Sequence, residues 1–368
     1  MEQKPIIVGI SQGDINGIGY EVIIKALMDN MINELLVPVI YGSPKVAAYH
    51  RKALNINNFS FNNIKGIEEA HSKRANMINC LDDNVRVELG KSTPQGAEAA
   101  LISIEMAVED LKAGKIDALV TAPIDKHSIQ SEKFNFPGHT EYLKDKFGVE
   151  DTLMFMIGES MKIGIVTGHV PISEVPGLVT IESVLKKIRL MNNSLMYDFA
   201  IRKPRIALLG LNPHAGDNGL LGKEEEEKII PAIKKAQQEG ILAFGPFPAD
   251  GFFGAGSFKS FDGILAMYHD QGLTPFKALS FDTGVNFTAG LPVIRTSPVH
   301  GTAFSIAGKN EASENSFRQA LYLACDIFRN RQTYPEVTKN PLRRQDIDIR
   351  SERADELPPE IQNSDHTL

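Results

Sequence analysis

LNPHAGDNGLLGKEE, at positions 211–225, joins two stretches with different hydrophobic patterns. RIALLG (205–210) precedes it and is typical of a buried strand, whereas KEEEEKIIPAIKKAQQEG (223–240) has the spacing of an amphipathic helix. The segment is therefore predicted to be a strand-to-helix loop, and loops at the carboxyl ends of strands bind ligands in open α/β sheets. Its glycines permit positive φ values around His214. For this loop alone, a Gly-rich turn with a surface histidine is the alternative interpretation.

The same arrangement recurs at other histidines. Five of the nine histidines follow apolar runs and adjoin Gly, Pro, Asp or Thr, in PGHTE, TGHVP, NPHAG, MYHDQG and PVHGT (His139, His169, His214, His269 and His300). A single histidine at a strand end is most often a hydrogen-bonded loop residue, whereas several indicate a shared cleft. If His169, His214 and His269 converge, their imidazoles suit zinc, cobalt or a similar divalent ion. Their spacing does not fit a single-helix zinc motif, and ordinary loop histidines remain the alternative.

The composition is that of an ordinary globular protein of 368 residues, long enough for two domains with a core in each. A formal net charge of −7 argues against a nucleic-acid-binding surface. No apolar run reaches the roughly 20 residues needed to span a bilayer. The amino terminus, MEQKPIIVGI, has no signal-peptide pattern, and Cys80 and Cys325 are isolated in the sequence. We therefore expect a cytoplasmic protein without nucleic-acid or membrane partners.

Strands alternate with helices along the chain, which predicts a mainly parallel sheet flanked by helices and split by a cleft. TLMFMIG (152–158) and KIGIVTG (162–168) are predicted to pair as neighbouring strands. Residues 55–83 are polar and are expected to be irregular, and GPFPAD (245–250) is expected to be a Pro-rich turn. From Gln332 onward the chain has the composition of a polar tail.

Two nucleotide-binding motifs are incomplete in this sequence. Glycines 13, 17 and 19 do not have the G-x-G-x-x-G spacing, and GKS (90–92) lacks the leading glycine of a P-loop because position 85 is valine. The residues that contact a dinucleotide therefore stay unassigned.

Seven motifs together resemble those of the 4-hydroxythreonine-4-phosphate dehydrogenase family of vitamin B6 biosynthesis, over about residues 6–327. In chain order they are GDINGIGYE, PGHTEYL, TGHVP, LNPHAGDNGLLGKEE, GPFPAD, LAMYHDQGL and GVNFTAGLPVIRTSPVHGTAF. The resemblance implies NAD- or NADP-dependent oxidation of the 3-hydroxyl of 4-phosphooxy-L-threonine. The resulting β-keto acid would lose CO2 and give 3-amino-2-oxopropyl phosphate, on the route to pyridoxal 5'-phosphate.

The resemblance also implies an α/β fold like that of isocitrate and isopropylmalate dehydrogenases, with two α/β/α domains and the active site in the cleft between them. We expect the first domain, on the cofactor side, at 1–130 plus about 278–331. The second domain, at 131–277, would carry the metal histidines, and 332–368 would form the tail. The family is a homodimer with its active site at the subunit interface and metal ligands from both chains.

The family's site residues carry over to matching positions. One divalent ion (zinc, magnesium or cobalt) would be bound by His169, His214 and His269. The substrate, a small phosphorylated hydroxy acid, would be bound by His139, Thr140, Lys277, Asn286 and Arg295. We assign Lys277 and Arg295 to anion binding, without deciding which meets phosphate and which meets carboxylate. Asp250, Asp270 and Lys277 are the candidate catalytic residues, the two carboxylates for proton transfer or for orienting a histidine ligand. A turn-capping role is the alternative for both carboxylates.

The sequence departs from the family pattern in two loops. The first has Ile15, Asn16 and Tyr20 in place of the residues of GDPAGIGPE, and the second reads GDNGLLG in place of GEGGHMG. Neither change touches a proposed metal ligand, but both could alter substrate fit. A dehydrogenase of threonate or erythronate 4-phosphate is therefore the alternative function. A non-redox protein that binds a phosphometabolite or transfers an acyl group is a third.

Overall fold

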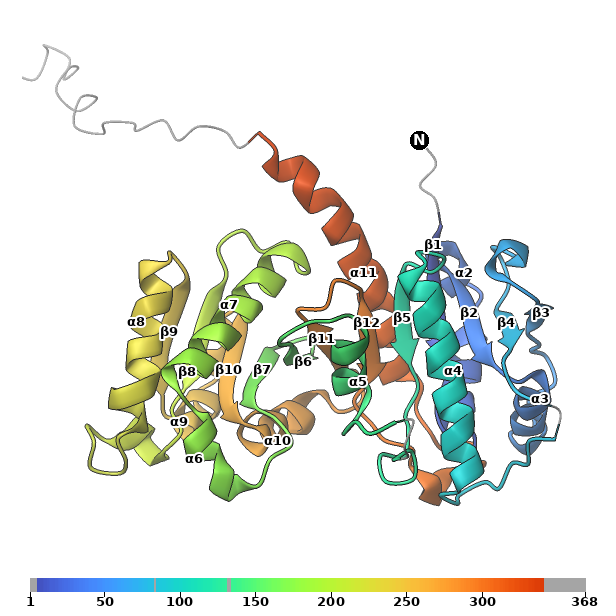
Figure 1. The fold of residues 1–368 in the computed structure, drawn as a ribbon, viewed down its shortest axis with the longest axis horizontal. Helices are drawn as coiled ribbons and strands as arrows, with labels where there is room; N and C mark the ends of the chain where they lie inside the picture. Colours follow the sequence, from blue (N-terminus) through green and yellow to red (C-terminus); the bar gives the residue numbers. More distant parts are fainter. Residues whose placement is uncertain (1–4, 83, 131–133, 341–368) are drawn as a thin grey trace, which may run out of the picture.

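The computed structural model describes residues 5–82, 84–130 and 134–340, and their strands form one mixed sheet (Figure 1). The order across this sheet is β3-β4-β2-β1-β5-β12-β11-β6-β7-β10-β8-β9. The strands are β1 (Ile6–Ser11), β2 (Leu36–Gly42), β3 (Asn62–Ile64), β4 (Asn76–Asn79), β5 (Ala118–Thr121), β6 (Leu153–Ile157), β7 (Lys162–Thr167), β8 (Arg205–Leu209), β9 (Leu242–Phe247), β10 (Gly263–Tyr268), β11 (Val285–Ala289) and β12 (Arg295–Pro298).

Strand direction reverses in the middle of this sheet. The neighbouring pairs from β3 to β12 are parallel, as are those from β7 to β9. The pairs β12–β11, β11–β6 and β6–β7 are antiparallel. The predicted mainly parallel sheet is confirmed, and so is the predicted pairing of 152–158 with 162–168. One sheet runs through both segments that we expect to form separate domains, so the division between them stays a prediction.

Helices cover both faces of the sheet (Figure 1). They are α1 (Gly19–Leu27), α2 (Ile32–Leu35), α3 (Pro44–Ala53), α4 (Pro94–Lys112), α5 (His139–Lys146), α6 (Val175–Leu178), α7 (Ile181–Tyr197), α8 (Ile230–Gln238), α9 (Ala249–Gly254), α10 (His269–Ser280) and α11 (Asn315–Thr338). Shorter helical turns are η1 (Ile67–Glu69), η2 (Ile172–Glu174), η3 (Pro213–Gly216), the π-helical η4 (Glu225–Ile229), η5 (Ser257–Ser260) and η6 (Phe304–Ile306). None of the described helices is long and apolar enough to cross a lipid bilayer.

Side-chain caps set where three of the longer helices begin. The hydroxyl groups of Ser43, Thr93 and Thr180 accept hydrogen bonds from backbone N–H groups in the first turns of α3, α4 and α7. In α3 and α4 a proline follows the cap, where its missing N–H group costs no hydrogen bond. The Ser-Pro pair at 43–44 and the Thr-Pro pair at 93–94 are therefore local sequence signals for the starts of these two helices.

The alternation of side chains along the strands separates the two faces of the sheet. In β1, β5, β8 and β10, every second residue belongs to one large hydrophobic cluster that also includes α1, α7, α8 and α11. The intervening residues belong to two smaller clusters on the opposite face, one with α4 and α5 and the other with α9 and α10. The face between these smaller clusters is formed by β6, β11 and β12. It is the part of the fold that positions the candidate site.

Three local predictions are wrong. Residues 55–83 contain β3 and β4, two short Asn-rich strands whose composition resembles that of a loop. GPFPAD is not a turn, because Gly245–Phe247 complete β9 and Asp250 lies in α9. The chain after Gln332 continues as α11 to Thr338 instead of starting a tail there. The rest of the predicted tail, 341–368, lies outside the described residues.

Candidate active site

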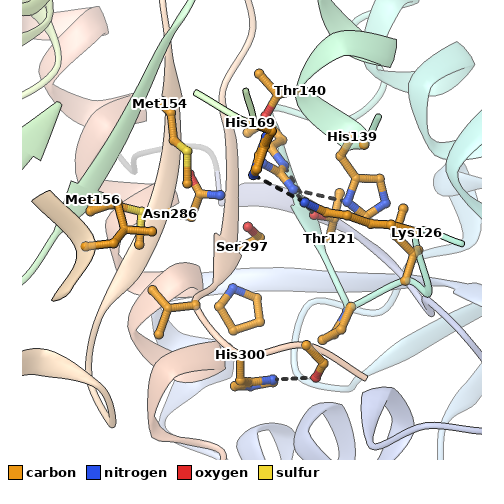
Figure 2. Close-up of a pocket in the computed structure, with 18 of the residues that line it drawn as sticks. Thr121, Lys126, His139, Thr140, Met154, Met156, His169, Asn286, Ser297 and His300 are labelled. Atoms are coloured by element: carbon orange, nitrogen blue, oxygen red, sulfur yellow. Dashed lines mark hydrogen bonds between the residues drawn. The ribbon is translucent and has the colours of Figure 1, made fainter. Parts of the chain in front are cut away.

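A cavity of about 290 Å³ lies on the face formed by β6, β11 and β12 (Figure 2). Asn286 of β11 is paired in register with Met156 of β6 and with Ser297 of β12, so these three side chains point to the same side of the sheet. Two residues further along each strand, Met154 and Arg295 share that side. The floor of the cavity is thus one face of three adjacent strands.

Arg295 and His139 form a buried polar unit beside this floor. The Arg295 side chain donates from Nε and Nη2 to Thr121 Oγ1 (3.2 and 2.7 Å) and from Nη1 to Thr288 Oγ1 (3.2 Å). Its Nη2 also donates to His139 Nδ1 at 3.1 Å. Among the described residues no carboxylate forms an ion pair with Arg295, which is only 3% exposed. Burial lowers the pKa of Arg295 to about 10, although the negative charge of Glu141 in the same cavity opposes this shift, so the site holds at neutral pH a cation that no carboxylate contacts directly.

The contact with Arg295 fixes the proton of His139. A guanidinium can only donate, so Nδ1 of His139 accepts and the proton of the neutral ring is on Nε2. Burial, together with the charges of Arg295 and Lys126, lowers the pKa of His139 well below its ordinary value and keeps the ring neutral. His139 Nε2 is buried and has no hydrogen-bond partner. His139 therefore presents a free N–H donor, as a ligand-binding histidine would.

Two more buried polar atoms at the cavity lack partners. They are Asn286 Oδ1 and His300 Nε2. His300 Nδ1 contacts the carbonyl oxygen of Gly301 at 3.2 Å, and burial lowers the pKa of His300. Protein interiors rarely leave such atoms unsatisfied, so their position beside Arg295 and His139 indicates a polar ligand.

His169 and His269 meet at the rim of the cavity, from the loop after β7 and the start of α10. Their ring centroids are 5.4 Å apart. His269 Nδ1 lies 2.7 Å from Asp270 Oδ1, so this nitrogen donates to the carboxylate and leaves Nε2 as an acceptor or metal ligand. Burial and the nearby charge of Lys126 lower the pKa of His169, which favours the neutral ring that a metal requires. Lys126 Nζ is 3.5 Å from His169 Nε2 (Figure 2).

Two of the other predicted substrate residues also reach the cavity. Lys277 follows His269 by two steps of four residues on α10, so both lie on the same face of this helix and line the cavity. Thr140 lines it from the first turn of α5, next to His139. All five predicted substrate residues therefore line one cavity, together with two of the three predicted metal ligands.

His214 does not line this cavity. It is exposed, and it lies in η3 on the loop after β8 with φ of 54°. Among the described residues no group of three or more His, Cys, Asp or Glu side chains is placed to hold a metal ion. A three-histidine site is thus not assembled by these residues within one chain.

The two candidate catalytic carboxylates differ in position. Asp270 adjoins the rim through its contact with His269, and its side chain is 82% exposed. Asp250 is exposed on α9, which packs against the loop of His214, and it does not line the cavity. The catalytic assignment of both residues stays a prediction.

Several residues that line the cavity were not predicted from the sequence. They are Thr121, Lys126, Glu141, Met154, Met156 and Ser297. Lys126 carried a usable signal, since it follows a strand in a loop with proline, as does His300, which was among the five histidines expected to share a cleft. Met154, Met156 and Ser297 carried no such signal. They lie on central strands, and the sequence does not show which face of a central strand a helix will cover.

The chain matches the family of the pyridoxal phosphate biosynthetic protein PdxA over residues 34–324. It is 54% identical to a 4-hydroxythreonine-4-phosphate dehydrogenase of Bacteroides thetaiotaomicron, over 94% of this chain and 95% of that protein. It is 41% identical to a putative D-threonate 4-phosphate dehydrogenase of Oceanobacillus iheyensis, over 89% of this chain and 99% of that protein. A crystal structure of a 4-hydroxythreonine-4-phosphate dehydrogenase from Klebsiella pneumoniae superposes with a TM-score of 0.77 at 31% identity, covering 89% of this chain and 99% of that one.

Proposed function

The chain belongs to the PdxA family, and we propose that its cavity oxidises and decarboxylates 4-phosphooxy-L-threonine with NAD or NADP. The 3-hydroxyl carbon loses a hydride to the dinucleotide and the hydroxyl loses a proton. The β-keto acid then releases CO2 and takes up a proton to give 3-amino-2-oxopropyl phosphate. This places the chain in pyridoxal 5'-phosphate biosynthesis, and a cytoplasmic location goes with that role.

One observation carries this proposal. The buried guanidinium of Arg295, which forms no ion pair, and the free Nε2–H of His139 lie in the same cavity as the pair of His169 and His269. A cation and a neutral donor suit an oxyanion of the substrate, and two adjacent imidazoles suit a divalent ion. A phosphorylated hydroxy acid has both an anionic end and a hydroxyl that a metal could bind.

The residues present fit a metal in part. Asp270 bonds Nδ1 of His269 and so directs Nε2 of that ring to a divalent ion, whereas His169 Nε2 contacts Lys126 Nζ at 3.5 Å, a contact that the ion would replace. When bound there, zinc, magnesium or cobalt would act as a Lewis acid on the substrate hydroxyl. Arg295, His139, Thr140 and Asn286 would orient the substrate, and Lys277 would supply a second cation from α10. Lys277, Asp250 and Asp270 stay the candidate proton carriers.

The position of His214 supports our proposal that the protein is a homodimer in which each metal site has ligands from both chains. His214 is exposed on a loop that does not line the cavity, and exposed Leu220 and Leu221 lie on the same loop. A second copy of the chain would bring its His214 to the first copy's His169 and His269. Mixing inactive His214→Ala and His269→Ala chains should then restore activity, because one site of the mixed dimer keeps all three histidines. Mixed dimers of proven exchange that remain inactive would contradict this arrangement.

The direct test of the function is the absorbance of NADH after 4-phosphooxy-L-threonine is added to protein loaded with zinc or cobalt. We expect turnover that chelation abolishes and that metal restores. The proposal fails if the loaded protein gives no NADH or NADPH while a verified family member reacts in parallel.

D-threonate 4-phosphate is the second candidate substrate. The Oceanobacillus relative and the altered loops at 15–20 and 216–222 support it. This compound has a hydroxyl where the amino acid has an amino group, so the same anion-binding residues would serve both. Comparing kcat/KM for the two substrates at equal metal and dinucleotide concentrations decides between them.

A further inference from the structure

The loop that carries His214 has a strained conformation. Six successive residues, from His214 to Gly219, have φ between 44° and 84°. Four of them are not glycine (His214, Ala215, Asp217 and Asn218), and left-handed backbone is unfavourable for residues with a Cβ atom. Such a turn persists only where surrounding contacts determine it, and strained turns of this kind concentrate at functional sites.

Glu225, the first residue of η4, adds side-chain contacts to the backbone hydrogen bonds that the turn makes within itself. Its side chain is buried, and Oε1 accepts hydrogen bonds from the backbone N–H groups of Leu211 (2.7 Å) and Asn212 (2.8 Å). Its Oε2 accepts from Asn212 Nδ2 at 2.9 Å. The carboxylate thus bonds the residues that lead into the left-handed turn.

The same carboxylate also lies against the turn itself. A Cβ atom on Gly216 would be 2.6 Å from Glu225 Oε2, so the turn passes over the carboxylate at a distance that only glycine permits. Among the described residues Glu225 has no ion pair with a basic side chain, so its charge is balanced by the N–H groups of this loop. A buried carboxylate used in this way serves the conformation of the loop.

We propose that Glu225 is the positioning residue for His214. It holds the left-handed turn so that the imidazole projects from the surface, where the partner's metal site can use it. This inference rests on the proposed function, because it gives His214 the role of a metal ligand. The inference adds one requirement for metal binding besides the presence of His214. The left-handed turn must be formed before the metal binds.

The test compares Glu225→Gln and Glu225→Ala with Glu227→Gln, which removes an exposed carboxylate two residues along the same helical turn. In metal-free protein, hydrogen exchange at the amides of Leu211 and Asn212 should accelerate in both Glu225 variants and stay unchanged in Glu227→Gln. Cobalt affinity, measured by titration of its visible absorption, should fall about tenfold in Glu225→Gln and about 100-fold in Glu225→Ala, as for other groups that orient ligands. Glu227→Gln should bind cobalt as the parent does.

A double variant separates positioning from general stability. In a His214→Ala background, Glu225→Gln should cause no further loss of cobalt affinity, because the ligand that it orients is gone. Equal losses in both backgrounds, or faster exchange at Leu211 and Asn212 with unchanged cobalt affinity, would overturn the inference. Parent protein that binds no cobalt would instead refute the proposed function, and the exchange data would still report whether Glu225 holds the turn.

Discussion

Replacement of Arg295 by methionine tests the anion-binding role at the centre of the cavity. Methionine is unbranched, flexible and uncharged, so it removes the cation and keeps the packing of the aliphatic part of the side chain. We expect this variant to bind the phosphorylated substrate weakly while its fold is retained. Removing the cation relieves the desolvation cost that lowers the pKa of Arg295 to about 10, and this gain offsets part of the cost of leaving Thr121, Thr288 and His139 without its N–H groups.

The hydrogen bonds of Arg295 set the size of the effect. A guanidinium has five N–H groups, and four are used by Thr121, Thr288 and His139. One N–H, on Nη1, is left for a ligand. A hydrogen bond to a charged group contributes about 1.5–3 kcal/mol, which corresponds to roughly 10- to 150-fold in affinity.

Calorimetric titration of metal-loaded protein with 4-phosphooxy-L-threonine would measure this loss. Arg189→Met is the control, because it removes a cation from an exposed ion pair with Glu239 on the surface and should leave the affinity unchanged. Thermal unfolding without ligand should give midpoints for Arg295→Met within a few degrees of the parent. An affinity within threefold of the parent would refute the assignment of Arg295 to the substrate anion. A collapse of the midpoint would show that Arg295 is needed for the fold instead.

Three further predictions concern other parts of the chain. Burial lowers the pKa of His50 from 6.5 to about 4, so the unfolded state binds the extra proton and the free energy of unfolding falls as the pH drops from 6.5 towards 4. In urea unfolding, His50→Gln should reduce the slope of this free energy against pH by up to about 1.4 kcal/mol per pH unit. An unchanged slope would contradict this prediction. Gly13 (φ +69°) and Gly114 (φ +67°) both have left-handed backbone, but a Cβ atom would strike a backbone carbonyl oxygen only at Gly13. Gly114→Ala should lower the free energy of unfolding by about 1 kcal/mol, and Gly13→Ala should lower it clearly more. Equal losses of stability would be evidence against the clash. Asp270→Asn should weaken cobalt binding by about tenfold because it loosens the tautomer of His269, whereas unchanged binding would show that the exposed carboxylate is not needed.

Much of the fold could be predicted from local patterns. Apolar runs followed by Gly or Pro marked the buried strands, and Ser43 and Thr93 marked the starts of α3 and α4. The patterns failed at β3, a three-residue edge strand, and at its neighbour β4, because both strands are short and rich in Asn. They failed again at the end of α11, where polar composition did not end the helix at Gln332.

The site could be predicted only in part. His139, Asn286 and Arg295 were found through motifs, but the sequence could not show that Arg295 is buried without an ion pair or that His139 Nε2 has no partner. Those facts depend on strands that pair across long separations, such as β12 with β5. The sequence also could not predict that His214 lies outside the cavity, because a loop at the end of a strand need not face the cavity of its own chain.

The cavity has a simple physical origin in the order of the strands. A parallel strand buried on both faces has apolar side chains at most positions, as β1, β5, β8 and β10 do. The antiparallel strands β6, β11 and β12 are covered by helices on one face, so Phe155 and Phe287 enter the large cluster there. Their opposite face lies between α4 and α5 on one side and α9 and α10 on the other. Asn286 and Arg295 can lie on this face without replacing apolar residues of the hydrophobic core. The floor of the cavity is therefore the open part of this face, where Asn286 and Arg295 lie beside two methionines, and the flanking helices α5 and α10 bring His139, His269 and Lys277 to its edges.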